Sequence, residues 1–181
     1  MTIALIVVAV LVVLVILVYN ALVRARVRVE NAWSQIDVQL KRRIDLIPNL
    51  VETVKGYAAH EQKTFDAVIQ ARNAAASAAP TPAAQAAADG ALTGALRQLF
   101  ALSEAYPDLK ANQNFLALQE ELTATEGRVA YARQFYNDSV MKYNTLIQNF
   151  PTLLLARIGG FTAKEFFEAD ATDRVVPKVQ F

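Results

Sequence analysis

The chain has no cysteine and a single histidine among its 181 residues. The absence of cysteine excludes disulfides, thiolate nucleophiles and cysteine-ligated metal, and it gives no information on the redox compartment. His60-Glu61 begins the zinc motif His-Glu-x-x-His, but Thr64 occupies the position of the second histidine. One histidine also cannot supply the paired Glu-x-x-His motifs of di-iron helical bundles. The sequence therefore predicts no metal, no cofactor and no recognisable catalytic residue.

Charged side chains are absent from the first 23 residues. From Ile3 to Val18 every side chain is Ile, Ala, Leu or Val, which approaches the roughly 20 apolar residues that a transmembrane helix needs. A cleaved signal peptide would carry a basic start and a small-residue cleavage site, and neither occurs here. The alternative, a helix buried in a soluble oligomer, usually carries some polar residues. We predict a permanent transmembrane anchor over residues 1–23.

The first charges, Arg24, Arg26 and Arg28, follow this apolar run directly. Lys and Arg next to a membrane span stay on the cytoplasmic side, so we expect the N-terminus outside and the remaining chain inside. With 18 basic and 17 acidic residues the net charge is +1, which creates no strong field for nucleic acid. Residues 24–181 suffice for one domain with a modest core.

Apolar residues at steps of three and four predict an all-α fold, with the anchor continuous with an antiparallel bundle of long helices over residues 24–150. We expect the first bundle helix to be kinked at Pro48 and to extend to about Ala74. Pro80 and Pro82 predict a loop near 77–90, followed by a shorter helix that is firmest over 91–106. Pro107 should end that helix, and Asp108 or Asn112 should cap the next. The stripe of the first bundle helix comprises Trp33, Ile36, Leu40, Ile44, Ile47, Leu50, Val51, Val54, Ala58, Phe65 and Val68.

The last long helix has the most regular pattern in the chain. Its apolar stripe keeps heptad spacing over five repeats, which predicts packing like that of a coiled coil until Pro151 ends the helix. Small members of the stripe would let a partner helix approach closely. The stripe comprises Phe115, Leu118, Leu122, Thr125, Val129, Ala132, Tyr136, Ser139, Tyr143, Leu146 and Phe150.

Several motifs resemble those of the LemA family. They are the run from Ala32 through Trp33 to Arg43 with Leu46–Val51, the run Tyr106–Asn112, Leu118–Leu122, and Tyr136-Asn137. The likeness extends over nearly the whole chain and implies a single-pass protein of the bacterial plasma (inner) membrane with a cytoplasmic helical bundle. It implies no established activity. Relatives are associated with magnetosome formation and cell-envelope homeostasis, which suggests a role in membrane organisation.

Two groups of residues are candidates for contacts outside the chain. Basic residues after the anchor are candidate membrane-surface or partner contacts, although a solvated helix face with local ion pairs would show the same pattern. They are Arg24, Arg26, Arg28, Lys41, Arg42 and Arg43. An apolar tail, residues 151–181, should pack on the bundle or a neighbour, with the membrane surface as the other possibility. Its candidate oligomer contacts are Leu153, Leu154, Leu155, Ile158, Phe161, Phe166 and Phe167.

Three long helices after the anchor would place Phe150 at the end of the bundle far from the bilayer. The apolar tail would then be covered most simply by another copy of the chain. We therefore expect a non-enzymatic, membrane-anchored scaffold or adaptor that acts through helix–helix contacts. The alternatives are a self-assembling protein that remodels or organises membranes and, last, an enzyme of unrecognised type. The expected partners are the lipid bilayer, further copies of the chain and other membrane proteins, but no nucleic acid.

Overall fold

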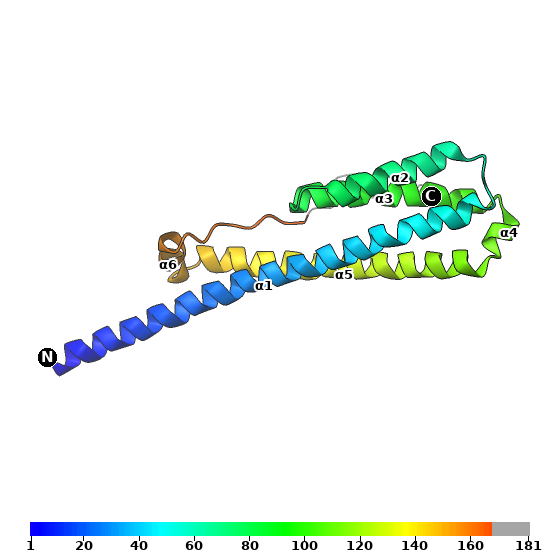
Figure 1. Ribbon diagram of the computed structural model, residues 1–181. Helices are drawn as coiled ribbons and strands as arrows, with labels where there is room; N and C mark the ends of the chain where they lie inside the picture. The colour runs from blue at the N-terminus through cyan, green and yellow to red at the C-terminus, as the bar shows by residue number, and fades with distance from the viewer. Residues whose placement is uncertain (168–181) are drawn as a thin grey trace, which may run out of the picture. The chain divides into compact units, whose positions relative to one another are not determined.

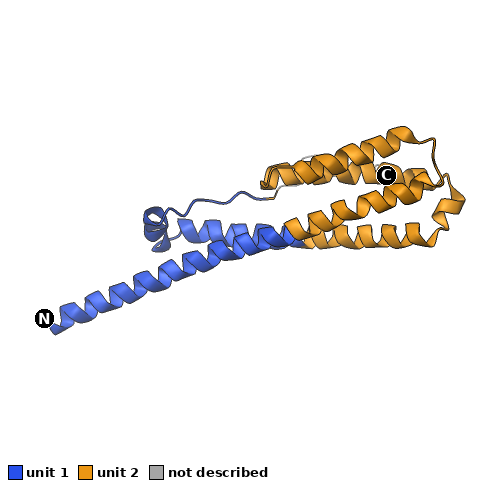
Figure 2. Cartoon of the chain, in the orientation of Figure 1, with its two compact units in different colours: residues 1–36, 132–166 blue, residues 37–131, 167–181 orange. Residues whose placement is uncertain are grey.

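The computed structural model describes residues 1–167, and every regular element in that range is a helix (Figure 1). This confirms the predicted all-α fold. The helices are α1 (Thr2–Lys55), α2 (Gln62–Ser77), α3 (Pro82–Ser103), α4 (Pro107–Lys110), α5 (Gln113–Gln148) and α6 (Thr152–Ile158). They form two compact units (Figure 2). Unit 1 comprises residues 1–36 and 132–166; unit 2 comprises residues 37–131 and, within the described range, Phe167.

Helix α1 is 54 residues long and continues through Pro48. Proline removes one backbone hydrogen bond, but apolar residues on both sides of it hold the helix in the core: Ile47 and Leu50 are buried. The helix ends at Lys55, where the amides of Tyr57 and Ala58 both bond to the carbonyl of Val54 at 3.0 Å. The predicted continuity of the apolar N-terminal helix with the first bundle helix is thus confirmed.

The chain turns after Lys55, and this corrects the prediction of one helix up to Ala74. Residues 56–61 form a connection, and α2 begins at Gln62 as a separate helix. Val54, Ala58 and Phe65 are buried on both sides of the turn, so the helical spacing of apolar residues continues across it. Periodicity alone could not reveal this turn. The extra helix reverses the direction of every element that follows.

The second correction concerns the predicted loop near 77–90. Only residues 78–81 separate α2 from α3, and the alanine-rich stretch after Pro82 is helical. Thr81 is extended and its hydroxyl accepts the amide of Ala84 at 3.4 Å. Pro82 occupies the first helical position, where the missing N–H costs nothing. Here proline starts a helix, whereas the two prolines in the sequence predict an interruption.

Unit 2 is a helical bundle with one apolar core. The core is built from α1, α2, α3, α4 and α5, and α2 packs against α3. Asn112 caps α5 by accepting the amide of Phe115 at 3.0 Å, as one of the two predicted caps. The buried residues of this core are Ile44, Ile47, Leu50, Val51, Val54, Ala58, Phe65, Val68, Ala75, Leu92, Ala95, Leu96, Leu99, Leu109, Phe115 and Leu122.

Unit 1 pairs the N-terminal part of α1 with the C-terminal part of α5. Trp33 packs on Tyr136 with ring centroids 5.5 Å apart, and the stripe of α5 buries Ala132, Ser139 and Tyr143 here. Helix α6 follows α5, and the turn at Gly159-Gly160 then leads into residues 161–166, which we name the C-terminal segment. Gly160 has a φ of 68°, and the amide of Phe161 bonds to the carbonyl of Ala156 at 3.0 Å. This is the glycine-dependent cap expected at a helix C-terminus.

Candidate membrane-proximal surface

The N-terminal part of α1 is the one stretch of the described residues that is long and apolar enough to span a membrane. Every residue from Met1 to Leu17 is exposed, and the first fully buried side chain of α1 is Leu22. At 1.5 Å per residue, residues 3–23 are roughly 30 Å long, the thickness of a bilayer's hydrocarbon core. Arg24 would then lie at the edge of that core and Arg28 about 6 Å beyond it, among the lipid headgroups.

A small hollow lies beside these arginines, between α1 and α5. It has a volume of about 250 Å³, and all three charged residues in its lining are cations. Alanine and serine supply the room, because their short side chains leave space between the helices. Ser139 donates its hydroxyl to the carbonyl of Phe135 at 2.8 Å. We name this feature the cationic hollow; its lining is Ala21, Arg24, Ala25, Arg28, Ser139 and Lys142.

A second, larger depression of about 440 Å³ shares Arg24 and Arg28 with the cationic hollow. Residues one turn apart on α1 form one wall, with apolar side chains nearest the anchor and two amides further on. Phe135 of α5 forms the other wall and is 38% exposed. We name it the α1 groove; its lining is Val23, Arg24, Val27, Arg28, Asn31, Gln35 and Phe135.

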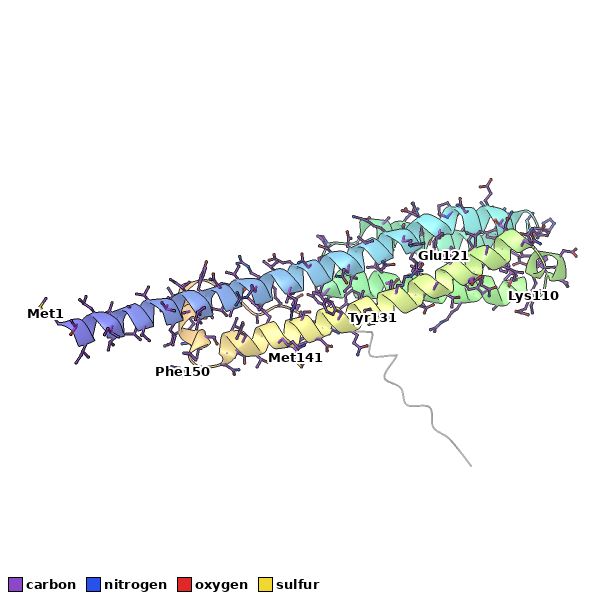
Figure 3. The ribbon with its side chains drawn as sticks, turned by 90° about the horizontal axis from the view of Figure 1, so that it is seen from below. Met1, Lys110, Glu121, Tyr131, Met141 and Phe150 are labelled. Atoms are coloured by element: carbon purple, nitrogen blue, oxygen red, sulfur yellow. The ribbon has the colours of Figure 1, made fainter. Side chains whose placement is uncertain are left out.

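Phe161 lies at the membrane-proximal end of unit 1. Its ring is 5.9 Å from that of Tyr19, centroid to centroid, and the guanidinium of Arg26 lies 5.3 Å above it. The expectation that the end of α5 lies far from the bilayer was therefore wrong. The unrecognised turn at residues 56–61 is the reason, because it gives α5 the opposite direction. Figure 3 shows Phe150 on the side of Met141 that faces Met1.

The C-terminal segment is held against α5 through its backbone. Tyr136 and Tyr143 donate their hydroxyls to the carbonyls of Glu165 at 2.9 Å and Thr162 at 3.0 Å. Asn144 bonds both to the carbonyl and to the amide of Lys164, at 2.9 Å each. Burial raises the pKa of both tyrosines. These hydrogen bonds fix the path of the chain after α6.

The second basic cluster is engaged within unit 2. Lys41 pairs with Asp37 one turn earlier at 2.8 Å, and Arg42 pairs with Glu121 of α5. Arg43 is buried and lies 2.7 Å from the carboxylate of Asp89 on α3, with Glu126 3.9 Å away. A buried guanidinium cannot contact a membrane surface or a partner. For Arg43 the candidate role is therefore wrong, because Asp89, 46 residues further along the chain, holds it inside the core.

The first basic cluster and the apolar tail also contain both residues that are engaged within the chain and residues that are exposed. Arg26 turns to Phe161 and Glu30, whereas Arg24 and Arg28 are exposed and line both depressions. Of the seven apolar tail candidates, two are buried within the chain, Phe161 and Phe167, and cannot be contacts. Leu153 and Leu155 are half-buried, and the exposed ones are Leu154, Ile158 and Phe166.

Sequence reasoning missed the α5 side of both depressions. The sequence places Ser139 in the buried stripe of α5, and no local pattern marks Lys142 or Phe135 as a contact. The signal that could have found them is the antiparallel direction of α5, which returns Lys142 to the level of the first arginines. No cluster of three or more His, Cys, Asp or Glu side chains suited to a metal occurs within residues 1–167.

Comparison with known proteins assigns the family. The sequence profile of the LemA family matches residues 32–181, most of the chain. The chain belongs to the LemA family. The expected resemblance is thereby confirmed, and the matched range covers both the bundle and the membrane-proximal half of α5.

The individual relatives are distant in sequence, but each aligns with most of this chain. Protein LemA of Metamycoplasma hominis is 26% identical over 159 residues, 86% of this chain and 71% of the relative. Magnetosome protein MamQ of Magnetospirillum gryphiswaldense is 26% identical over 189 residues, 89% and 70%. Magnetosome protein MamQ 2 of Paramagnetospirillum magneticum is 26% identical, covering 83% and 64%. Together with the apolar part of α1, the family indicates a membrane-associated protein.

Proposed function

We propose that this LemA-family chain is a non-enzymatic, membrane-anchored scaffold that binds further copies of itself through the α1 groove. The observation that carries the proposal is the continuity of α1, a single helix that joins the exposed apolar anchor to the groove. A second helix that packs along the anchor could therefore continue in a straight line into the groove. Tethering two chains in one membrane keeps their local concentration high, so a modest contact area suffices.

The chemistry of the α1 groove suits a neighbouring helix. Val23 and Val27 offer apolar contact close to the bilayer, where Val27 is 42% exposed. Asn31 and Gln35 lie one and two turns further on and can exchange hydrogen bonds across an interface. The anchor itself has no glycine, serine or ionisable residue from Ile3 to Val18, so it lacks the small-xxx-small spacing and the polar contacts that usually join membrane helices. The drive for assembly therefore comes from the groove.

Single-cysteine cross-linking in native membranes tests this proposal, because the chain has no cysteine of its own. Val27→Cys places a thiol in the α1 groove and should give dimers with a short thiol cross-linker. Met141→Cys is the matched control: it is 51% exposed on α5 and does not line the groove. Equal cross-linking of both variants, or none for Val27→Cys, would overturn the proposal.

Orientation follows from the same charges. Arg24 and Arg28 favour the cytoplasmic side of a bacterial inner membrane, so the bundle is proposed to be cytoplasmic. Protease added to intact spheroplasts should then spare everything beyond Arg28. Digestion of the bundle from outside would show the opposite orientation. The proposal on the α1 groove would be unaffected.

The second candidate function is organisation or remodelling of the membrane by an assembled coat. The exposed apolar residues of α6, Leu154 and Ile158, favour it because remodelling requires direct contact with lipid. Purified full-length protein should then deform liposomes into tubules or smaller vesicles. If the liposomes stay unchanged at protein densities that support cross-linking, only the scaffold function would remain.

A further inference from the structure

Three large apolar side chains form an exposed stripe along α6 and the residue before Pro151. Phe150, Leu154 and Ile158 are spaced by four residues and are 81%, 55% and 84% exposed. Within α6, Leu154 and Ile158 are four residues apart and therefore lie on the same face of the helix, whereas Phe150 precedes the helix. The other face of α6 is buried through Thr152 and Ala156. We name these three residues the α6 stripe.

The start of α6 is fixed to the end of α5. Thr152 donates its hydroxyl to the carbonyls of Asn149 and Leu146. The amide of Leu153 also bonds to the carbonyl of Asn149, at 2.7 Å. These bonds satisfy polar groups within the chain and set which face of α6 points outward.

The level of α6 along α1 follows from the residue after its cap. Phe161 comes three residues after Ile158 and touches Tyr19 of α1. Tyr19 precedes Arg24 by five residues, about 7–8 Å along the helix. If Arg24 marks the edge of the hydrocarbon core, Tyr19 and Phe161 lie about 7–8 Å inside that edge. Figure 1 shows α6 at the end of α5, level with the N-terminal half of α1.

We propose that α6 lies in the membrane interface and buries the α6 stripe among the lipids of the leaflet next to Arg24. It forms a second lipid contact beside the transmembrane anchor. Interfacial helices place their apolar face roughly 5–10 Å into the boundary between headgroups and acyl chains, the level at which Phe161 lies. Arg157, the one charged residue of α6, is exposed and can reach the headgroups.

The bilayer is the occupant that the geometry favours over a second copy of the chain. Phe161, three residues after the α6 stripe, contacts Tyr19 in the apolar part of α1, so lipid would be present at this level around every copy. Two further cations, Arg28 and Lys142, line the cationic hollow in the same unit and suit the phosphates of the same leaflet. The inference does not depend on the proposed scaffold function, because a monomer would make the same contact.

Site-directed spin labelling of the full-length protein in liposomes of phosphatidylglycerol and phosphatidylethanolamine tests the inference. Ile158→Cys and Leu154→Cys would carry the nitroxide, each as the only cysteine of the chain. Collisions with oxygen report apolar surroundings, and collisions with a water-soluble nickel chelate report aqueous ones. Val12→Cys in the anchor provides the lipid reference. Tyr131→Cys, 72% exposed on α5, provides the aqueous reference.

Both α6 labels should behave like the Val12 label: a several-fold higher ratio of oxygen to nickel accessibility than the Tyr131 label shows. A ratio equal to that of Tyr131 would overturn the inference. Protection from both reagents with dipolar broadening would also overturn it, and would show a second copy on the α6 stripe. Two label positions guard against a local disturbance at one of them, and the circular dichroism of each variant checks that the helices are intact.

Discussion

The buried ion pair between Arg43 and Asp89 allows the sharpest prediction about stability. The two side chains are 3% and 6% exposed, and their nearest charged atoms are 2.7 Å apart. Glu126, the third charge, is 54% exposed and 3.9 Å from Arg43, too far and too solvated to take over from Asp89. Asp89→Asn removes the buried carboxylate while nearly keeping its shape.

The expected cost follows from what Asp89→Asn leaves behind. Removing one partner of a buried pair leaves an uncompensated charge, which typically destabilises a protein by about 3–5 kcal/mol. For a chain of this size each kcal/mol lowers the melting temperature by roughly 2–4 °C, so the midpoint should fall by about 6–20 °C. Glu126→Gln should cost less than about 1 kcal/mol, because exposed ion pairs contribute little.

Thermal and urea unfolding of detergent-solubilised full-length protein, followed by circular dichroism, measures these differences. The double variant Arg43→Met with Asp89→Leu is the matched control, since replacing a whole buried pair by apolar residues is often neutral or stabilising. It should therefore recover most of the stability lost in Asp89→Asn. An unchanged midpoint for Asp89→Asn, or a double variant less stable than the single one, would refute the reasoning.

Three further predictions concern the turn after α6, the C-terminal segment and the cationic hollow. Gly160→Ala should destabilise the protein by about 1–2 kcal/mol in urea unfolding, because Gly160 has a positive φ. Gly94→Ala, at an open position within a helix, should instead stabilise the protein by up to about 1 kcal/mol. A Gly160→Ala variant more stable than the Gly94→Ala variant would contradict the glycine-dependent cap. Burial raises the pKa of Tyr136 and Tyr143, so their neutral hydroxyls stabilise the C-terminal segment fully below about pH 10, and this is lost as the pH rises through the raised pKa values. Ultraviolet titration should show a phase of tyrosine ionisation well above pH 10, and Tyr143→Phe should remove part of that phase. A titration without this late phase would count against the hydrogen bonds to the C-terminal segment. Replacing the three cations of the cationic hollow by Gln should lower the protein's preference for phosphatidylglycerol over phosphatidylcholine in nanodiscs, and an unchanged preference would argue against headgroup binding there.

The elements predicted well are those that the sequence encodes locally. The apolar N-terminal part of α1 required only a run of apolar residues, and α5 required only a regular stripe from Phe115 to Tyr143, of which most members are buried. The turn at residues 56–61 could not be predicted, because Val54, Ala58 and Phe65 keep helical spacing across it while its hydrogen bonds depend on the packed ends. One missed turn then reversed α5 and misplaced the apolar tail.

The contact surface shows the same limit of prediction from local sequence patterns. Arg24 and Arg28 could be proposed from their position after the anchor, since that argument is local. The burial of Arg43 depends on Asp89, in an alanine-rich stretch that the prolines marked as loop, so no local pattern linked the two. Lys142 needs the direction of α5. Residues brought together across helices are the part of a site that sequence periodicity does not contain.

Assembly through the α1 groove is the central claim, and the mass of the full-length protein in detergent tests it most directly. Light scattering with correction for bound detergent should give a multiple of the 19.9 kDa chain. The variant Val27→Lys with Phe135→Lys places two charges in the groove and should lower the mass to that of one chain. A monomeric parent protein, or an oligomer that the double variant leaves intact, would contradict the claim.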